Sequence, residues 1–133
     1  MYLLDTNIIS ARMRNHEKVE EKLNAAANAE EPVFMSGVSH YEIKRGLLAV
    51  NATRKLKIYE EIRQDFQMLF LDTEDVFDKA AEIHAALKRR GELIQDADIL
   101  IAATALLRNL ILVSNDSHFQ RISGLATANW IRD

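Results

Sequence analysis

Four acidic residues have the chemistry and the positions needed to bind a divalent cation: Asp5, Glu42, Asp98 and Asp116. Asp5 and Asp116 come after short apolar runs, and Asp98 opens a longer one. Hard ions such as Mg²⁺ or Mn²⁺ favour carboxylate oxygens as ligands. Carboxylates packed together without a cation repel one another, and some of their pKa values rise. If these side chains converge, the sequence therefore predicts a functional metal site.

Each acid also has an ordinary structural interpretation. Asp5 or Thr6 could cap the helix that follows the first apolar run. Glu42 could complete a capping box in which Ser39 is the N-cap. Asp116 lies in a polar stretch that could be a simple turn. On the residues alone, both interpretations stay open for each of these acids.

A further acid, Asp96, lies two residues before Asp98 at the start of an apolar helix. Residues two apart on a helix face different ways, so the two acids should have different roles. We expect Asp96 to be the N-cap and Asp98 to lie in the first turn, where the helix dipole favours a negative charge. An acid there must point out of the core or meet a cation. Asp72 opens another acidic helix start, and capping explains it without a metal.

The segments between the acids indicate how they could be brought together. Short apolar runs predict strands at residues 2–4, 33–35, 68–71 and 111–113, with a weaker fifth at 128–131. Longer segments predict helices near residues 7–28, with a break near Asn15, and near 38–50, 53–67, 74–90 and 97–108. The alternation predicts a three-layer α/β/α fold around a central, mostly parallel sheet of four to five strands. Sites in such sheets lie beyond the carboxyl ends of the strands, where Asp5 and Asp116 are expected.

Composition limits the class of protein. A chain of 133 residues with 48% hydrophobic residues suits one globular domain spanning residues 1–133. The absence of cysteine excludes disulfides and thiolate metal ligands. No apolar run is long enough to cross a membrane and no signal peptide is visible, so we expect a cytoplasmic protein. A net charge of −3 argues against a protein that binds RNA phosphates through its own positive charge. An acidic protein could still act on RNA if its acids held divalent cations.

The chain resembles the PIN-domain ribonucleases, and specifically the VapC-type toxins of bacterial toxin–antitoxin pairs. The resemblance runs nearly end to end, with successive acids 37, 56 and 18 positions apart. The matching segments are LLDTNI at 3–8, EIKRG at 42–46, DILIAATAL at 98–106, LVSNDSHF at 112–119 and ISGL at 122–125.

The resemblance implies a divalent-metal-dependent endoribonuclease that hydrolyses RNA with Mg²⁺ or Mn²⁺ and leaves 5′-phosphate and 3′-hydroxyl ends. Asp5, Asp98 and Asp116 would hold the ion. Glu42 would complete its shell or recruit a second ion, and Asp96 is a further candidate ligand. Thr6, Asn7, Ser114 and Asn115 would support the site. The resemblance also implies a cellular RNA target such as tRNA, a homodimer, and a VapB-like antitoxin that occupies the site.

Basic residues beside the acids could hold RNA, as a rim around an acidic centre. The candidates are Arg12, Arg14, Lys44 and Arg45, with residues 88–90 shortly before the third acid. Ordinary solvated surface charge is the alternative for each of them. We expect the histidines to be solvated or packed rather than catalytic, namely His16, His40, His84 and His118. Gly46, inside a predicted helix, would be explained by the close approach of another element.

Two other functions are weighed against RNA cleavage. A non-cleaving PIN-like module that binds RNA or protein would keep the fold, but the four intact acids argue against it. A phosphate-transfer domain of the haloacid-dehalogenase or response-regulator type also has an Asp after its first strand. The dehalogenase pattern places a second Asp where this chain has Asn7, and both types need a later Lys, but none follows Lys88.

Overall fold

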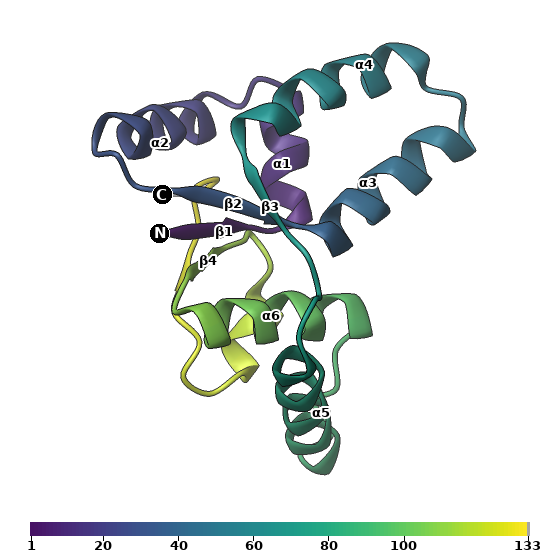
Figure 1. The fold of residues 1–133 in the computed structure, drawn as a ribbon, viewed down its shortest axis with the longest axis vertical. Coiled ribbons are helices and arrows are strands. Elements are labelled where there is room, and N and C mark those ends of the chain that lie inside the picture. The colour runs from purple at the N-terminus through teal and green to yellow at the C-terminus, as the bar shows by residue number, and fades with distance from the viewer. Residues whose placement is uncertain (133) are drawn as a thin grey trace.

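The strands in this computed structural model, which describes residues 1–132, form one parallel sheet (Figure 1). The short apolar runs of the sequence become these strands because each can be covered on both faces. The strands are β1 (Tyr2–Leu4), β2 (Val33–Ser36), β3 (Gln67–Leu69), β4 (Ile111–Val113) and β5 (Thr127–Ala128).

Helices connect the strands in alternation, as expected. The predicted break near Asn15 is confirmed, because this residue adopts a left-handed backbone (φ 58°) between two helices. The segment predicted as helix 53–67 ends its α-helix at Ile62 and continues as a short 3-10 turn. The helices are α1 (Thr6–Met13), α2 (Glu17–Asn28), α3 (Gly37–Ala49), α4 (Thr53–Ile62), α5 (Glu74–Arg89) and α6 (Asp96–Arg108), with 3-10 helices η1 (Arg63–Asp65) and η2 (Ser117–Arg121).

The strand order is β3-β2-β1-β4-β5, and every neighbouring pair is parallel. From β1 the chain adds β2 and β3 on one side, then crosses to add β4 and β5 on the other. The order therefore reverses between β1 and β4, and an open parallel sheet forms its crevice at that point. The predicted three-layer α/β/α fold is confirmed.

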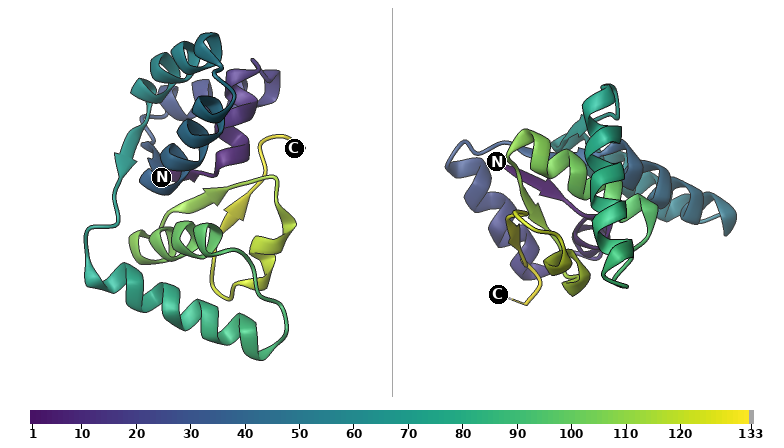
Figure 2. Two further views of the ribbon diagram at one scale, coloured as in Figure 1. Left: turned by 90° about the vertical axis from the view of Figure 1, so that its right-hand side faces the viewer. Right: turned by 90° about the horizontal axis from the view of Figure 1, so that it is seen from below.

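Two apolar cores cover the two faces of the sheet, because side chains along a strand alternate in direction. Leu3 and Leu112 belong to the core that α5 and α6 complete. Leu4 and Val113 belong to the other core, with residues from α1 to α4. Figures 1 and 2 show these two helical layers, and α3 and α4 reach beyond the sheet edge as a pair. Within residues 1–132, no helix combines the length and the apolar character needed to cross a bilayer.

The last strand is shorter and earlier than predicted. β5 covers only Thr127–Ala128, whereas the prediction was 128–131. The Asn129 side chain accepts hydrogen bonds from the backbone N–H groups of Ile131 (2.9 Å) and Arg132 (3.2 Å) and so turns the chain out of the sheet. Trp130 then packs edge-on against Tyr2, with ring centroids 5.0 Å apart. The apolar residues that suggested a strand belong to this turn instead.

Two predicted helix caps are wrong and one is right. Ser36 is the N-cap of α3 and its hydroxyl accepts from Val38 N, so Ser39 is not the cap. β2 runs directly into α3 without a loop, which moves the helix start toward the strand. Gln95, not Asp96, is the N-cap of α6. Asp5 does cap α1, where its carboxylate accepts from Thr6 N at 2.8 Å.

Candidate active site

The loops after β1 and β4 lie side by side at the point where the strand order reverses. Asp5 directly follows β1, and its backbone N–H donates to the Val113 carbonyl of β4 at 2.9 Å. Ser114 directly follows β4, and Asp116 comes two residues later. The sheet register therefore brings two acid-bearing segments together from distant parts of the sequence.

Asp5 is buried, with 4% of its surface exposed, and both of its carboxylate oxygens accept hydrogen bonds. One oxygen accepts from Thr6 N, and the other accepts from Ser114 Oγ (2.7 Å) and Asn7 Nδ2 (3.1 Å). Burial raises the pKa of Asp5 to about 6, and the charges of Asp98 and Glu42 add to the rise. The bonds from Ser114 and Thr6 oppose it.

Polar side chains link Asp5 to the loop that carries Asp116. Ser114 Oγ, which donates to Asp5, also accepts from Asp116 N at 3.0 Å. Asn115 N donates to Asn7 Oδ1 at 3.1 Å, and Asn129 Nδ2 donates to Asn115 Oδ1 at 3.0 Å. These contacts explain physically how Asn7, Ser114 and Asn115 can support the acids. Asn129 was not singled out in the sequence.

Glu42 points from α3 toward the start of α1. The Thr6 hydroxyl donates to Glu42 Oε1 at 2.9 Å and lies 3.0 Å from Ser39 Oγ. Because α3 begins at Gly37, Glu42 lies beyond the first turn and does not form the proposed capping box. The contact with Thr6 directs this carboxylate toward Asp5 and Asp98, whose pKa values its charge raises.

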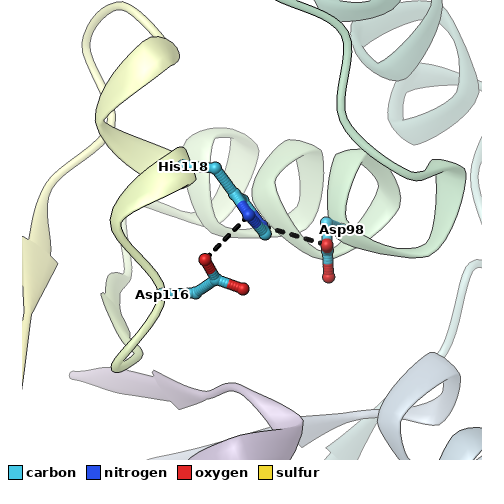
Figure 3. A group of neighbouring side chains, drawn as sticks. All are labelled: Asp98, Asp116 and His118. Atoms are coloured by element: carbon cyan, nitrogen blue, oxygen red, sulfur yellow. Dashed lines mark ion pairs between the residues drawn. The ribbon is translucent and has the colours of Figure 1, made fainter.

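Asp98, Asp116 and His118 form a compact group (Figure 3). The His118 ring lies between the two carboxylates, with Nδ1 2.7 Å from Asp116 Oδ1 and Nε2 3.0 Å from Asp98 Oδ2. One ligand atom from each of the three residues falls within 4.8 Å of the others. His118 was not among the predicted site residues, yet it lies between two of the predicted acids. The signal was present in the sequence, because a carboxylate and an imidazole two residues apart after a buried strand are a plausible ligand pair.

The four predicted acids lie close enough for their charges to interact. Burial raises the pKa of Asp98, the charges of Glu42 and Asp116 raise it further, and His118 lowers it. The charges of Asp98 and Glu42 in turn raise the pKa of Asp5. Asp5 and Glu42 nevertheless lie outside the compact group, and so does Asp96, which is exposed at the start of α6. The four predicted acids thus form one charged region, and Asp98 and Asp116 form its most compact part together with His118.

The compact group has the donor chemistry of a divalent-metal site. Carboxylate oxygens and imidazole nitrogen both bind divalent ions of the first transition row. Neighbouring ligands of an octahedral ion with bonds of about 2.1 Å are roughly 3 Å apart. The 3.0 Å between Asp98 Oδ2 and His118 Nε2 matches that separation. The residues present therefore fit a divalent cation.

The predicted RNA-holding residues lie in different surroundings. Arg12 pairs with Glu20 at 3.2 Å, on a hollow near the amino ends of β2 and β3 and so away from Asp5. Lys44 donates to Glu60 at 3.1 Å, and the Arg45 guanidinium lies 5.1 Å from the centre of the Tyr41 ring. Their role in RNA binding stays a prediction.

Arg14 lines a groove of about 400 Å³ that also contains Thr6 and Glu42. Its walls come from α1, α3 and α4 and include Met13, Ile43, Leu47 and Ile58. Gly46 lines the same groove, and a Cβ placed on it would meet nothing within 4 Å. The predicted close approach of another element at Gly46 is therefore wrong, since the residue faces open space.

The model of the PIN domain family matches residues 2–125, which include strands β1 to β4, helices α1 to α6 and all four acids. The chain belongs to the PIN domain family. This membership sets aside the dehalogenase and response-regulator alternative. The matched region includes the loops after β1 and β4, which carry Asp5 and Asp116.

Two curated proteins and one crystal structure resemble this chain over most of its length. Ribonuclease VapC1 of Methanocaldococcus jannaschii is 34% identical over 89 residues, which cover 66% of this chain and 62% of that protein. Toxin FitB of Neisseria gonorrhoeae is 32% identical over 88% of each chain. The crystal structure of FitAcB from Neisseria gonorrhoeae superposes with a TM-score of 0.84 at 30% identity and covers 100% of both chains.

Proposed function

We propose that this PIN domain is a divalent-metal-dependent endoribonuclease and acts as the toxin of a toxin–antitoxin pair. The observation that carries the proposal is the group formed by Asp98, Asp116 and His118 beside Asp5, at the reversal of strand order. The similarity to a VapC ribonuclease and to the toxin FitB supports the activity and the role. The proposed substrate is a cellular RNA such as tRNA, which places the action in the cytoplasm.

Asp98 and Asp116 would hold Mg²⁺ or Mn²⁺, with Asp5 and Glu42 adding negative charge or further ligands. When bound, such an ion activates water as a nucleophile and stabilises charge on the phosphate and on the leaving oxygen. The chain's own contribution is to hold the carboxylates in place. Thr6 does so for Glu42, and Ser114 and Asn7 do so for Asp5.

RNA approach would depend on the same charges. Several ionised carboxylates at one sheet edge repel a phosphodiester, so the substrate can approach only when cations neutralise them. Among the predicted RNA-holding residues, Arg14 lines the groove that contains Glu42, so it would guide RNA toward the edge. Lys44 and Arg45 would act further out.

The proposal includes assembly. We propose that the chain acts as a single nuclease domain, forms a homodimer and is silenced by a cognate VapB-like antitoxin. The similarity to Toxin FitB and to the FitAcB structure supports a partner of this kind.

The test uses the purified protein with defined RNAs, tRNA included, in Mn²⁺, Mg²⁺ or EDTA. We expect cleavage that needs the divalent ion, with 5′-phosphate and 3′-hydroxyl ends identified by end-labelling. Asp98→Asn should abolish it. Asp72→Asn is the matched control, because Asp72 is exposed and pairs with Arg108, 3.7 Å away. Products ending in 2′,3′-cyclic phosphate would contradict the mechanism, since they require attack by the ribose hydroxyl. RNA binding without cleavage would instead support the non-cleaving module.

A further inference from the structure

Both ring nitrogens of His118 lie close to a carboxylate, and one of them is buried without a hydrogen bond. Nδ1 lies 2.7 Å from Asp116 Oδ1, the shorter of the two contacts. An ionised carboxylate can only accept, so this contact favours the tautomer that carries its hydrogen on Nδ1. In the neutral imidazole, this leaves Nε2 with a lone pair and no hydrogen.

The surroundings of Nε2 do not satisfy that lone pair. The atom is buried from solvent, and no described group forms a hydrogen bond with it. Its nearest charged neighbour is Asp98 Oδ2, 3.0 Å away. Two electron-rich atoms therefore face each other at the separation of neighbouring metal ligands.

We propose that Nε2 of His118 is a direct ligand of the catalytic ion and that Asp116 orients its ring. This inference rests on the proposed metal-dependent function. A histidine ligand commonly donates its other ring N–H to a carboxylate, which fixes the tautomer and makes the ligand more basic. The 2.7 Å contact between His118 Nδ1 and Asp116 Oδ1 brings the two groups as close as that arrangement requires, and Asp98 completes the group.

The consequence is a choice of metal. Mg²⁺ favours sites built wholly from oxygen, whereas first-row transition ions accept imidazole readily. A nitrogen donor beside Asp98 makes this site favour Mn²⁺ over Mg²⁺. The role of Asp116 also changes, because Oδ1 is engaged by the ring and only its second oxygen is free to meet the ion.

The test measures metal binding on the full chain without RNA. Pulsed electron paramagnetic resonance of bound Mn²⁺ should reveal coupling to a ligand nitrogen. Labelling the wild-type protein with ¹⁵N-histidine should change that coupling to the ¹⁵N pattern, which needs no variant. His118→Gln should abolish the coupling and weaken Mn²⁺ binding about 10- to 100-fold, the range found for groups that support metal ligands, while Mg²⁺ binding changes by less than about threefold.

His84→Gln is the matched control, since His84 lies on α5 and outside the metal-binding group. Mn²⁺ bound without nitrogen coupling would overturn the His118 inference and leave the proposed ribonuclease intact. Nitrogen coupling without RNA cleavage would support His118 as a ligand and overturn the proposed function. A protein that binds no Mn²⁺ would overturn both.

Discussion

The site has two halves, which differ in how deeply their carboxylates are buried and in what those carboxylates contact. In the buried half, Asp5 is 4% exposed and both of its oxygens accept hydrogen bonds, from Thr6, Asn7 and Ser114. In the open half, the side chains of Asp98 and Asp116 are 18% and 42% exposed and face the ring of His118.

This difference indicates a division of labour. A carboxylate whose oxygens are already bonded is held rigidly and has little freedom to follow an ion. The open half has a buried nitrogen without a hydrogen bond and carboxylates partly in reach of water, so it can rearrange around a cation. We infer that the open half provides the principal ligands and that the buried half contributes charge and rigidity.

The largest effect should come from Asp98→Asn in the open half. A bound ion supplies several kcal/mol of transition-state stabilisation, and each 1.36 kcal/mol corresponds to tenfold in rate. We therefore expect single-turnover cleavage to fall roughly 10³-fold, whereas the Asp72→Asn control stays near wild type. Full activity in Asp98→Asn, with activity lost in Asp5→Asn, would assign the ligands to the buried half instead.

The next effect is on stability, in the buried half. The pKa of Asp5 in the folded protein is about 6, above its usual value near 4. The folded state holds this proton more tightly, so the free energy of unfolding falls as pH rises from about 4 to 6 and stays low above. Asp5→Asn should then stabilise the metal-free protein by about 1–3 kcal/mol at pH 7.5 and show no gain near pH 4.

Urea unfolding in EDTA at the two pH values measures the difference. Equal pH dependence in wild type and Asp5→Asn would mean that burial does not perturb this carboxyl. The buried half would then not be distinguished by a carboxyl group with a raised pKa.

A smaller effect tests the link between the halves. Ser114→Ala removes the hydroxyl that donates to Asp5 and accepts from Asp116 N. We expect a loss of about 1–2 kcal/mol in unfolding free energy at pH 7.5, because a buried carboxylate loses a hydrogen bond. Without that bond the pKa of Asp5 rises further, so the fall of stability should extend to higher pH. Ser117→Ala, at an exposed position, is the control and should leave both unchanged.

The smallest effect concerns the basic residues outside both halves. Replacing Lys44 and Arg45 with Gln should weaken RNA binding a few-fold and reduce the slope of log affinity against log salt by about 1–2. Lys44 is partly neutralised by Glu60, so its share should be the lesser one. Filter binding over a salt series measures the slope, with the exposed Lys57→Gln as control. An unchanged slope would remove these residues from the RNA surface.

The fold was predictable because its signals are local. Short apolar runs such as residues 2–4 and 111–113 can be buried only as strands between helices, and that alternation predicts the layers. The order of the strands in the sheet could not be predicted in this way, because it does not depend on local sequence. The adjacency of β1 and β4, which brings Asp5 beside Ser114, depends on how the connecting helices cross the sheet.

The errors also have physical causes. Ser36 and Ser39 are both acceptable caps, and only the direct passage from β2 to α3 selects Ser36. His118 lies in a stretch with the composition of a turn, and the short helix η2 is what directs its ring between two acids. Acid types and spacing predict which carboxylates come together, but the direction of a ring depends on backbone angles that composition does not report.

The segment after Leu125 has a practical consequence. The family match ends at Leu125, yet β5, Asn129 and Trp130 follow it. A fragment trimmed to that boundary would keep the four predicted acids and still lose the strand paired with β4 and the amide that braces Asn115. Such a fragment would be a poor substitute for the whole chain, because its four predicted acids would be present while the loop bearing Asp116 would be less firmly held.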